Sequence, residues 1–106
     1  MHLIIDIFTK NDIVNPDPIV KKLETAVEVC GARKIETFVH SFGEGMGFTA
    51  FIMLAESHLA IHTWPEKGYV AMDVFMCSSG DPYAIIPFVE SLFGYDYTIH
   101  AHKRYT

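Results

Sequence analysis

Residues 48–76 read FTAFIMLAESHLAIHTWPEKGYVAMDVFM, and this stretch decides the fold class. It contains three segments rich in apolar, β-branched and aromatic residues, which predict strands at 48–55, 57–62 and 69–76. The turn formers at 65–68 (Pro-Glu-Lys-Gly) separate the second segment from the third. The first segment is apolar at nearly every position, which predicts a strand buried on both faces.

The sequence on either side adds three further strands and a helix. Segments 2–8, 34–42 and 95–102 have the β-branched or alternating character of strands. Asn15 or Asp17 can cap a helix that tolerates proline in its first turn, and a glycine follows its predicted end. The helix is indicated by apolar residues at helical spacing, namely Ile19, Val20, Leu23, Ala26, Val27 and Cys30.

A second helix is predicted between Asp81 and Gly94, with Asp81 as its cap. Pro87 conflicts with a helix that starts at Pro82, because proline beyond the first turn removes a hydrogen bond and clashes with the preceding turn. The helix therefore either kinks at Pro87 or begins later.

The predicted order is β-α-β-β-(β)-β-α-β, and the strands flank the helices without alternating strictly with them. This order predicts the α+β class, as a two-layer α/β sandwich with a mainly antiparallel sheet and both helices on one face. At 106 residues the chain, 1–106, is expected to form a single domain. One face of such a sheet is left uncovered, which leaves a homodimer open.

Composition and charge exclude several classes of partner. The formal net charge is -5, and no basic run is longer than Lys103-Arg104, so a nucleic-acid surface is not expected. No apolar run reaches transmembrane length, and the N-terminus lacks the basic start of a secretory signal. Cys30 and Cys77 form no CxxC pair, which favours free thiols and a cytoplasmic location.

Ser57 lies between a carboxylate and two imidazoles in the segment Glu56-Ser57-His58-Leu59-Ala60-Ile61-His62. A serine at a strand start is most often a turn hydroxyl. The chemical alternative is that its Oγ attacks the carbonyl carbon of Glu56 and forms an ester. Removal of the Ser57 Cα proton by His58 or His62 would then cleave the chain by elimination.

Histidine pairs also raise the question of a metal site. His58 and His62 are four residues apart in a predicted strand, and His100 and His102 have same-face strand spacing. No acidic residue lies at a recognisable ligand spacing, so we expect no metal.

Cys77 follows a predicted strand, where a buried structural thiol is the common case and a proton donor is the functional alternative. Phe42 and Trp64 are predicted to lie in loops, where aromatic rings either cover the core or stack on a planar base. Glu66 is either a turn carboxylate or an acceptor for a ribose diol.

These motifs resemble those of the short bacterial and archaeal S-adenosylmethionine decarboxylases. The resemblance covers most of the chain and is most specific at residues 56–77, ESHLAIHTWPEKGYVAMDVFMC. His2-Leu3 at the first strand and His40-x-Phe42 before a glycine loop also match the family. The loop at 43–47 is one residue longer than usual, Thr49 replaces a serine, and Asp6 stands where the family usually has glutamate.

The resemblance implies a role for each of these residues. The chain would be cut between Glu56 and Ser57 into fragments 1–56 and 57–106, and Ser57 would become a pyruvoyl group that forms a Schiff base with the substrate. The resemblance makes His62 the processing histidine and Cys77 the catalytic acid. The remaining matched positions assist processing (Thr49), stack on adenine (Phe42 and Trp64), bind ribose (Glu66) and contact substrate (Asp6).

The family implies decarboxylation of S-adenosylmethionine for polyamine synthesis, by a homodimer with active sites near the interface. Two alternatives stay open. One is a pyruvoyl-dependent decarboxylase of ornithine or arginine, and the other is an uncleaved, non-catalytic homologue that binds a partner decarboxylase.

Overall fold

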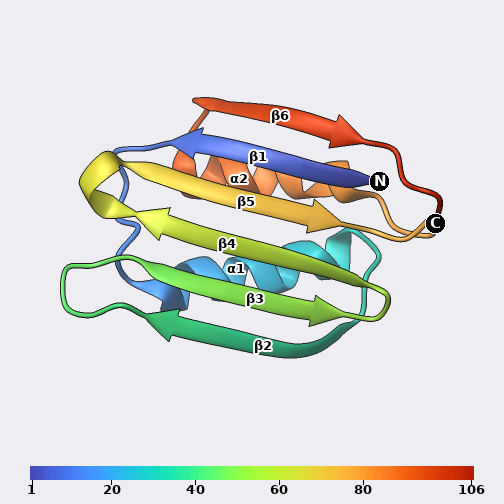
Figure 1. Cartoon of the computed structure of the whole chain (residues 1–106), viewed down its shortest axis with the longest axis horizontal. Coiled ribbons are helices and arrows are strands. Elements are labelled where there is room, and N and C mark those ends of the chain that lie inside the picture. Colours follow the sequence, from blue (N-terminus) through green and yellow to red (C-terminus); the bar gives the residue numbers. More distant parts are fainter.

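One sheet of six strands forms the front layer of the computed structural model, which describes residues 1–106 (Figure 1). Every neighbouring pair is antiparallel, in the order β2-β3-β4-β5-β1-β6. The predicted fold class, an α+β sandwich with a mainly antiparallel sheet, is therefore confirmed. The strands are β1 (His2–Phe8), β2 (Lys34–Ser41), β3 (Phe48–Leu54), β4 (Ser57–Trp64), β5 (Tyr69–Phe75) and β6 (Tyr97–His102).

Helix α1 (Pro16–Val29) follows the predicted pattern at both ends. The side chain of Asn15 accepts a hydrogen bond from the N–H of Asp17 at 3.2 Å, which satisfies one unpaired donor of the first turn. Gly31, just past the end, has a φ of +93°, a conformation that costs glycine little. All but one of the predicted apolar positions lie in the helix itself, and all six are buried against the sheet.

The conflict at Pro87 is resolved by a late start of the second helix. A 3₁₀ turn, η2 (Pro82–Ile85), comes first, and the Asp81 side chain caps it by accepting from the N–H of Tyr83 at 3.1 Å. Helix α2 (Ile86–Phe93) then begins one residue before Pro87, where the missing N–H has no helical partner to lose. Both helices cover the same face of the sheet (Figure 1). Neither has the length and apolar character needed to cross a bilayer.

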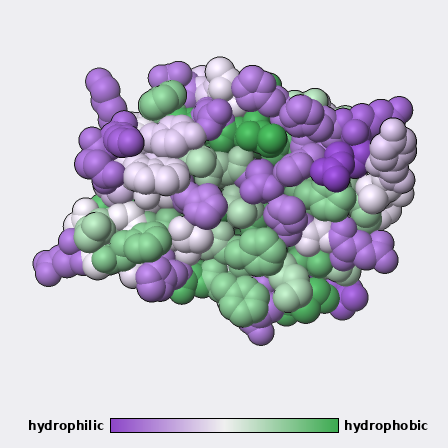
Figure 2. Space-filling view, viewed as in Figure 1, coloured by the Kyte–Doolittle hydropathy of each residue, from purple (hydrophilic) through white to green (hydrophobic).

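The prediction that segment 48–55 is buried on both faces is wrong. Alternate residues of β3, Phe48 to Leu54, are buried under the helices, whereas Thr49, Phe51 and Met53 lie on the other face. The fold has only two layers, so every strand has one face with no helix over it. We call the surface of the sheet that no helix covers the open face. Figure 2 looks onto it and shows hydrophobic side chains gathered across its centre and lower part.

Strand β4 is longer than predicted, and Trp64 is its last residue and not part of a loop. The strand continues because Thr63 pairs with Val70 and Trp64 with Tyr69 across the short 3₁₀ turn η1 (Pro65–Lys67). Strand β1 has the predicted bounds, and the bounds of β2, β3, β5 and β6 differ from the predicted ones by at most two residues. As a result β4 spans the sheet, with Ser57 at one end and Trp64 at the other.

Candidate active site

Ser57 is the first residue of β4, directly after the tight turn from β3. Glu56 in this turn has a φ of +60° and is the only residue other than glycine with positive φ. A side chain in this left-handed region costs about 1–2 kcal/mol. The peptide bond between Glu56 and Ser57 therefore lies in a strained turn.

Cys77 lies beside Ser57, two residues beyond the end of β5. Its backbone N–H donates to Ser57 Oγ at 3.1 Å, and its Sγ is 3.4 Å from Ser79 Oγ. Ser57, Cys77, Glu56 and Ser79 all line a cavity of about 200 Å³. We call these four residues the Ser57 half-site.

The thiol of Cys77 is polarised by its neighbours. The hydroxyl and backbone of Ser79, and then the hydroxyl of Ser57, lower the pKa of Cys77 by hydrogen bonding, against smaller opposing effects of burial and the Glu56 charge. Cys30 contrasts with it, because burial raises the pKa of that thiol to about 11. Both cysteines are free, and Cys30 is a core residue as predicted.

Five of the six remaining predicted residues gather at the other end of β4. Phe42, Thr49, His62, Trp64 and Glu66 all line a separate cavity of about 320 Å³. We call these five residues the His62 half-site. Its aromatic rings are accessible, with Phe42 54% and Trp64 37% exposed.

His62 is held from the neighbouring strand. Thr49 Oγ1 lies 2.9 Å from His62 Nδ1, across the β3–β4 ladder where the two residues are paired. When Nδ1–H donates to Thr49, the Nε2 lone pair is free to accept a proton. Thr49 thus has a hydroxyl in contact with the histidine, as a serine would.

The glycine loop is fixed to the same end of the sheet by Thr63, which is buried. Thr63 Oγ1 accepts from the N–H of Phe48 at 3.0 Å and donates to the carbonyl of Ile13 at 2.9 Å. A Cβ at Gly47 would lie 2.0 Å from the Thr63 carbonyl oxygen, so only glycine fits this approach. Nothing in the local sequence distinguishes Thr63, whose hydroxyl orders the wall of the cavity.

Within one chain the two half-sites are far apart. Ser57 and His62 are five residues apart on one regular strand, a separation of about 16 Å at the rise of a β-strand. The two cavities share no lining residue. His62 of the same chain therefore cannot reach the Cα proton of Ser57.

Asp6 belongs to neither cavity. Its carboxylate accepts a hydrogen bond from the hydroxyl of Tyr69, and this bond raises the pKa of Tyr69. Tyr69 in turn stacks on Trp64 with ring centroids 5.4 Å apart. Asp6 thus contacts the His62 half-site only through Tyr69, which sequence reasoning did not identify because nothing local distinguishes it from a strand aromatic.

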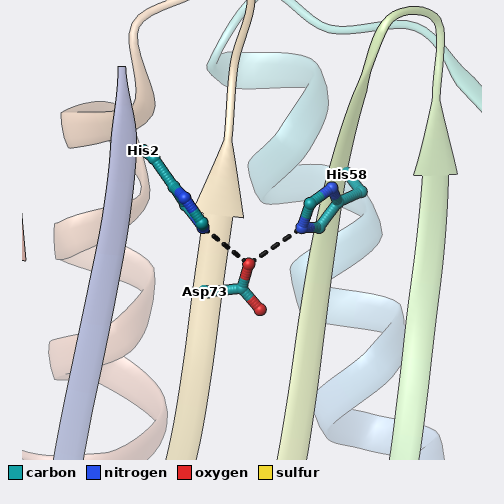
Figure 3. A group of neighbouring side chains, drawn as sticks. All are labelled: His2, His58 and Asp73. Carbon is teal, nitrogen blue, oxygen red and sulfur yellow. Dashed lines mark hydrogen bonds and ion pairs between the residues drawn. The ribbon is translucent and has the colours of Figure 1, made fainter. Parts of the chain in front are cut away.

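His58, the other histidine considered as a base, faces the open side of the sheet and is engaged by Asp73 (Figure 3). The histidine pairs considered in the sequence, His58/His62 and His100/His102, do not form a ligand group of three or more residues. The only group of three or more possible ligand residues is His2, His58 and Asp73. Local spacing could not reveal this group, because its members come from three strands.

Comparison with known proteins agrees with the fold and the motifs. The family model for S-adenosylmethionine decarboxylase matches residues 1–105. A protein of Methanococcus maripaludis strain C7 called S-adenosylmethionine decarboxylase proenzyme is 41% identical over 92 residues, which cover 84% of this chain and 75% of that protein. A Clostridium botulinum protein of the same name is 33% identical, over 84% of this chain and 78% of its own length.

A solved structure gives the same result. The adenosylmethionine decarboxylase of Aquifex aeolicus superposes with a TM-score of 0.75 at 30% identity, over 93% of this chain and 86% of the other. Sequence and structure agree over nearly the full length described, and this chain belongs to the S-adenosylmethionine decarboxylase family.

Proposed function

We propose that this protein decarboxylates S-adenosylmethionine with a pyruvoyl group made from its own Ser57, in a composite site formed by two copies of the chain. The observation that carries the proposal is the separation of the family's matched residues into two half-sites at opposite ends of β4. Each half-site has part of the required chemistry, and neither has all of it.

The first step is cleavage of the chain. Ser57 Oγ attacks the Glu56 carbonyl carbon, and the acyl group moves from the Ser57 nitrogen to its oxygen, which gives an ester. Loss of the Ser57 Cα proton then expels the Glu56 carboxylate, and hydrolysis releases ammonia and leaves the pyruvoyl group on residue 57. The left-handed conformation of Glu56 favours this step, because cleavage relieves the strain of the turn.

A second chain supplies the base. In a twofold-symmetric dimer with open faces stacked, the Ser57 end of one sheet can lie over the His62 end of the partner. His62 of the second copy then removes the proton, with Thr49 holding Nδ1. The symmetry gives two equivalent composite sites per dimer.

The open face has the character that such a dimer requires. Its exposed apolar side chains would be removed from water on stacking, a favourable change that a lone two-layer domain does not achieve. They include Ile4, Phe8, Phe38, Phe51 and Met53, each between 37% and 53% exposed.

The His62 half-site suits a nucleoside better than a bare amino acid. Phe42 and Trp64 can stack on the two faces of adenine, and the Glu66 carboxylate can accept hydrogen bonds from the ribose hydroxyls. Ornithine and arginine would leave these groups without partners, which disfavours them as substrates.

The Ser57 half-site suits the reacting carbon. A pyruvoyl group supplies an electron-withdrawing carbonyl that stabilises the negative charge left by departing carbon dioxide. Cys77 is positioned to donate a proton, with its thiol held by Ser79 at 3.4 Å. The product is an aminopropyl donor of the kind that polyamine synthesis consumes, and the two free thiols fit a cytoplasmic location.

Intact mass under denaturing conditions tests the first half of the proposal. We expect two fragments, 1–56 and 57–106, the second lighter than a serine-headed peptide by one ammonia. A single full-length mass in an active preparation would disprove the pyruvoyl group. Carbon dioxide release from S-adenosylmethionine, ornithine and arginine tests the second half, and we expect it only from the first.

A further inference from the structure

Three side chains outside both half-sites meet on the open face of the sheet. His2 of β1 and His58 of β4 flank Asp73 of β5, and both imidazole rings direct Nε2 at the same carboxylate oxygen (Figure 3). Each Nε2 lies 2.8 Å from Asp73 Oδ2. Nothing in the proposed cleavage or decarboxylation uses this group.

The geometry is close to that of a three-ligand metal site. All three ligand atoms lie within 4.8 Å of one another. Tetrahedral zinc with bonds of about 2.0–2.1 Å holds its ligand atoms about 3.3 Å apart, so ring rotations of modest size are sufficient. Two imidazoles and one carboxylate also leave a coordination position free for water.

The surroundings hold both imidazole rings in place. Phe75 packs against His2 at 5.7 Å and against His58 at 5.9 Å between ring centroids. Phe51 stacks on His58 from the other side, at 5.5 Å. Side chains already fixed by packing lose little conformational entropy when they bind a metal.

In the single chain the three side chains are partly accessible, so an ion can enter before the open faces of two copies stack. Their exposed fractions are 21% for His2, 31% for His58 and 29% for Asp73. The three strands that supply the ligands are adjacent in the sheet, so the ligand positions are fixed by backbone pairing.

We propose that His2, His58 and Asp73 form a binding site for a divalent transition metal of the zinc class, one ion per chain. The ion takes the place of the Nε2 protons at Asp73, each neutral ring then carrying its one proton on Nδ1, and it links β1, β5 and β4. If the chain is cut after Glu56, His2 is on one fragment and the other two ligands are on the second, so the ion also links the fragments.

The test is a calorimetric titration of tag-free protein with zinc chloride. A second titration uses cobalt(II), whose binding is measured by its visible absorption. Using Ser57→Ala protein, which stays uncut, separates this test from the proposed function. We expect one zinc per chain and a higher melting temperature with zinc. Asp73→Asn, which keeps the side-chain shape, should weaken zinc binding about tenfold or more.

His2→Gln provides a second ligand variant in case Asp73→Asn does not fold, and His100→Gln is the matched control on the same face. His100 lies opposite Ile4 in the register, outside the three-residue group. The control should bind zinc like the parent chain. Absence of binding at millimolar zinc would overturn the proposal, and so would binding that survives both ligand substitutions.

Discussion

The two ends of β4 are built differently. At the Ser57 end a strained turn and the loop after β5 bring small polar groups around a cavity of about 200 Å³. At the His62 end a glycine loop and the sheet place aromatic rings and a carboxylate around about 320 Å³. The first end is suited to bond breaking and the second to recognising a large, planar ligand, and one strand carries both.

Ser57→Ala should have the largest effect of any single substitution. We expect complete loss of chain cleavage and of decarboxylation, because both begin with the Ser57 hydroxyl. Intact mass should give one full-length species. Ser78→Ala, at an exposed neighbour of Cys77, is the control and should still be cut. Decarboxylation by the Ser57→Ala protein would rule out the pyruvoyl group.

The next largest effect tests whether two copies of the chain share each active site. Ser57→Ala and His62→Ala chains should each be inactive alone, whereas co-expression should restore activity in mixed dimers. Random pairing makes half of the dimers mixed, each with one intact composite site, so we expect about a quarter of wild-type activity. Activity no higher than that of the separate variants would mean that the half-sites are not shared.

A moderate effect is expected from a substitution in the His62 half-site. Trp64→Ala should raise KM for S-adenosylmethionine, since stacking on a base contributes about 1–3 kcal/mol, or roughly five- to 150-fold. Chain cleavage should be unaffected, and Trp64→Phe should recover most of the loss. The measurement is steady-state kinetics with intact mass on the same sample. Loss of cleavage in Trp64→Ala would show that the two ends do not have separate tasks.

The smallest effect is expected from Ser79→Ala at the other end. Hydrogen bonding from Ser79 lowers the pKa of Cys77, so without it this pKa rises toward its ordinary value. A proton donor acts only while protonated, so the alkaline limit of kcat should move to higher pH in the variant. Thr at this position should keep the wild-type profile. An unchanged limit in Ser79→Ala would mean that the thiol of Cys77 does not control it.

Much of the fold could be predicted because local patterns and the two-layer rule agree. The alternation of apolar and polar residues, the capping residues, and the glycine and proline residues between elements were sufficient to predict the element order and both helices. The error at 48–55 arose because apolar composition cannot distinguish a strand between two helical layers from one whose second face meets another copy. The length of β4 was missed because its last pairs depend on partners in β5.

Less of the site than of the fold could be predicted from the sequence. The identity of the matched residues came from a resemblance, and their division between two ends depends on the regular rise of one strand. Tyr69 beside Asp6 and Thr63 beside Gly47 are tertiary contacts with no local signature. Ser79 is only two residues from Cys77, but the sequence does not show that their side chains meet. The three-residue group around Asp73 was hidden for the same reason.

The strand order has a consequence for a chain cut after Glu56. The first fragment would hold β1, β2 and β3, and the second would hold β4, β5 and β6, with β1 inserted between β5 and β6. Three of the five ladders, β3–β4, β5–β1 and β1–β6, would therefore join different fragments. Neither fragment could dissociate without breaking ladders inside the sheet. We therefore expect the two fragments to stay associated as tightly as the same strands do in the uncut chain. Once separated in denaturant, they would face a slow, bimolecular reassembly that the uncut precursor never encounters.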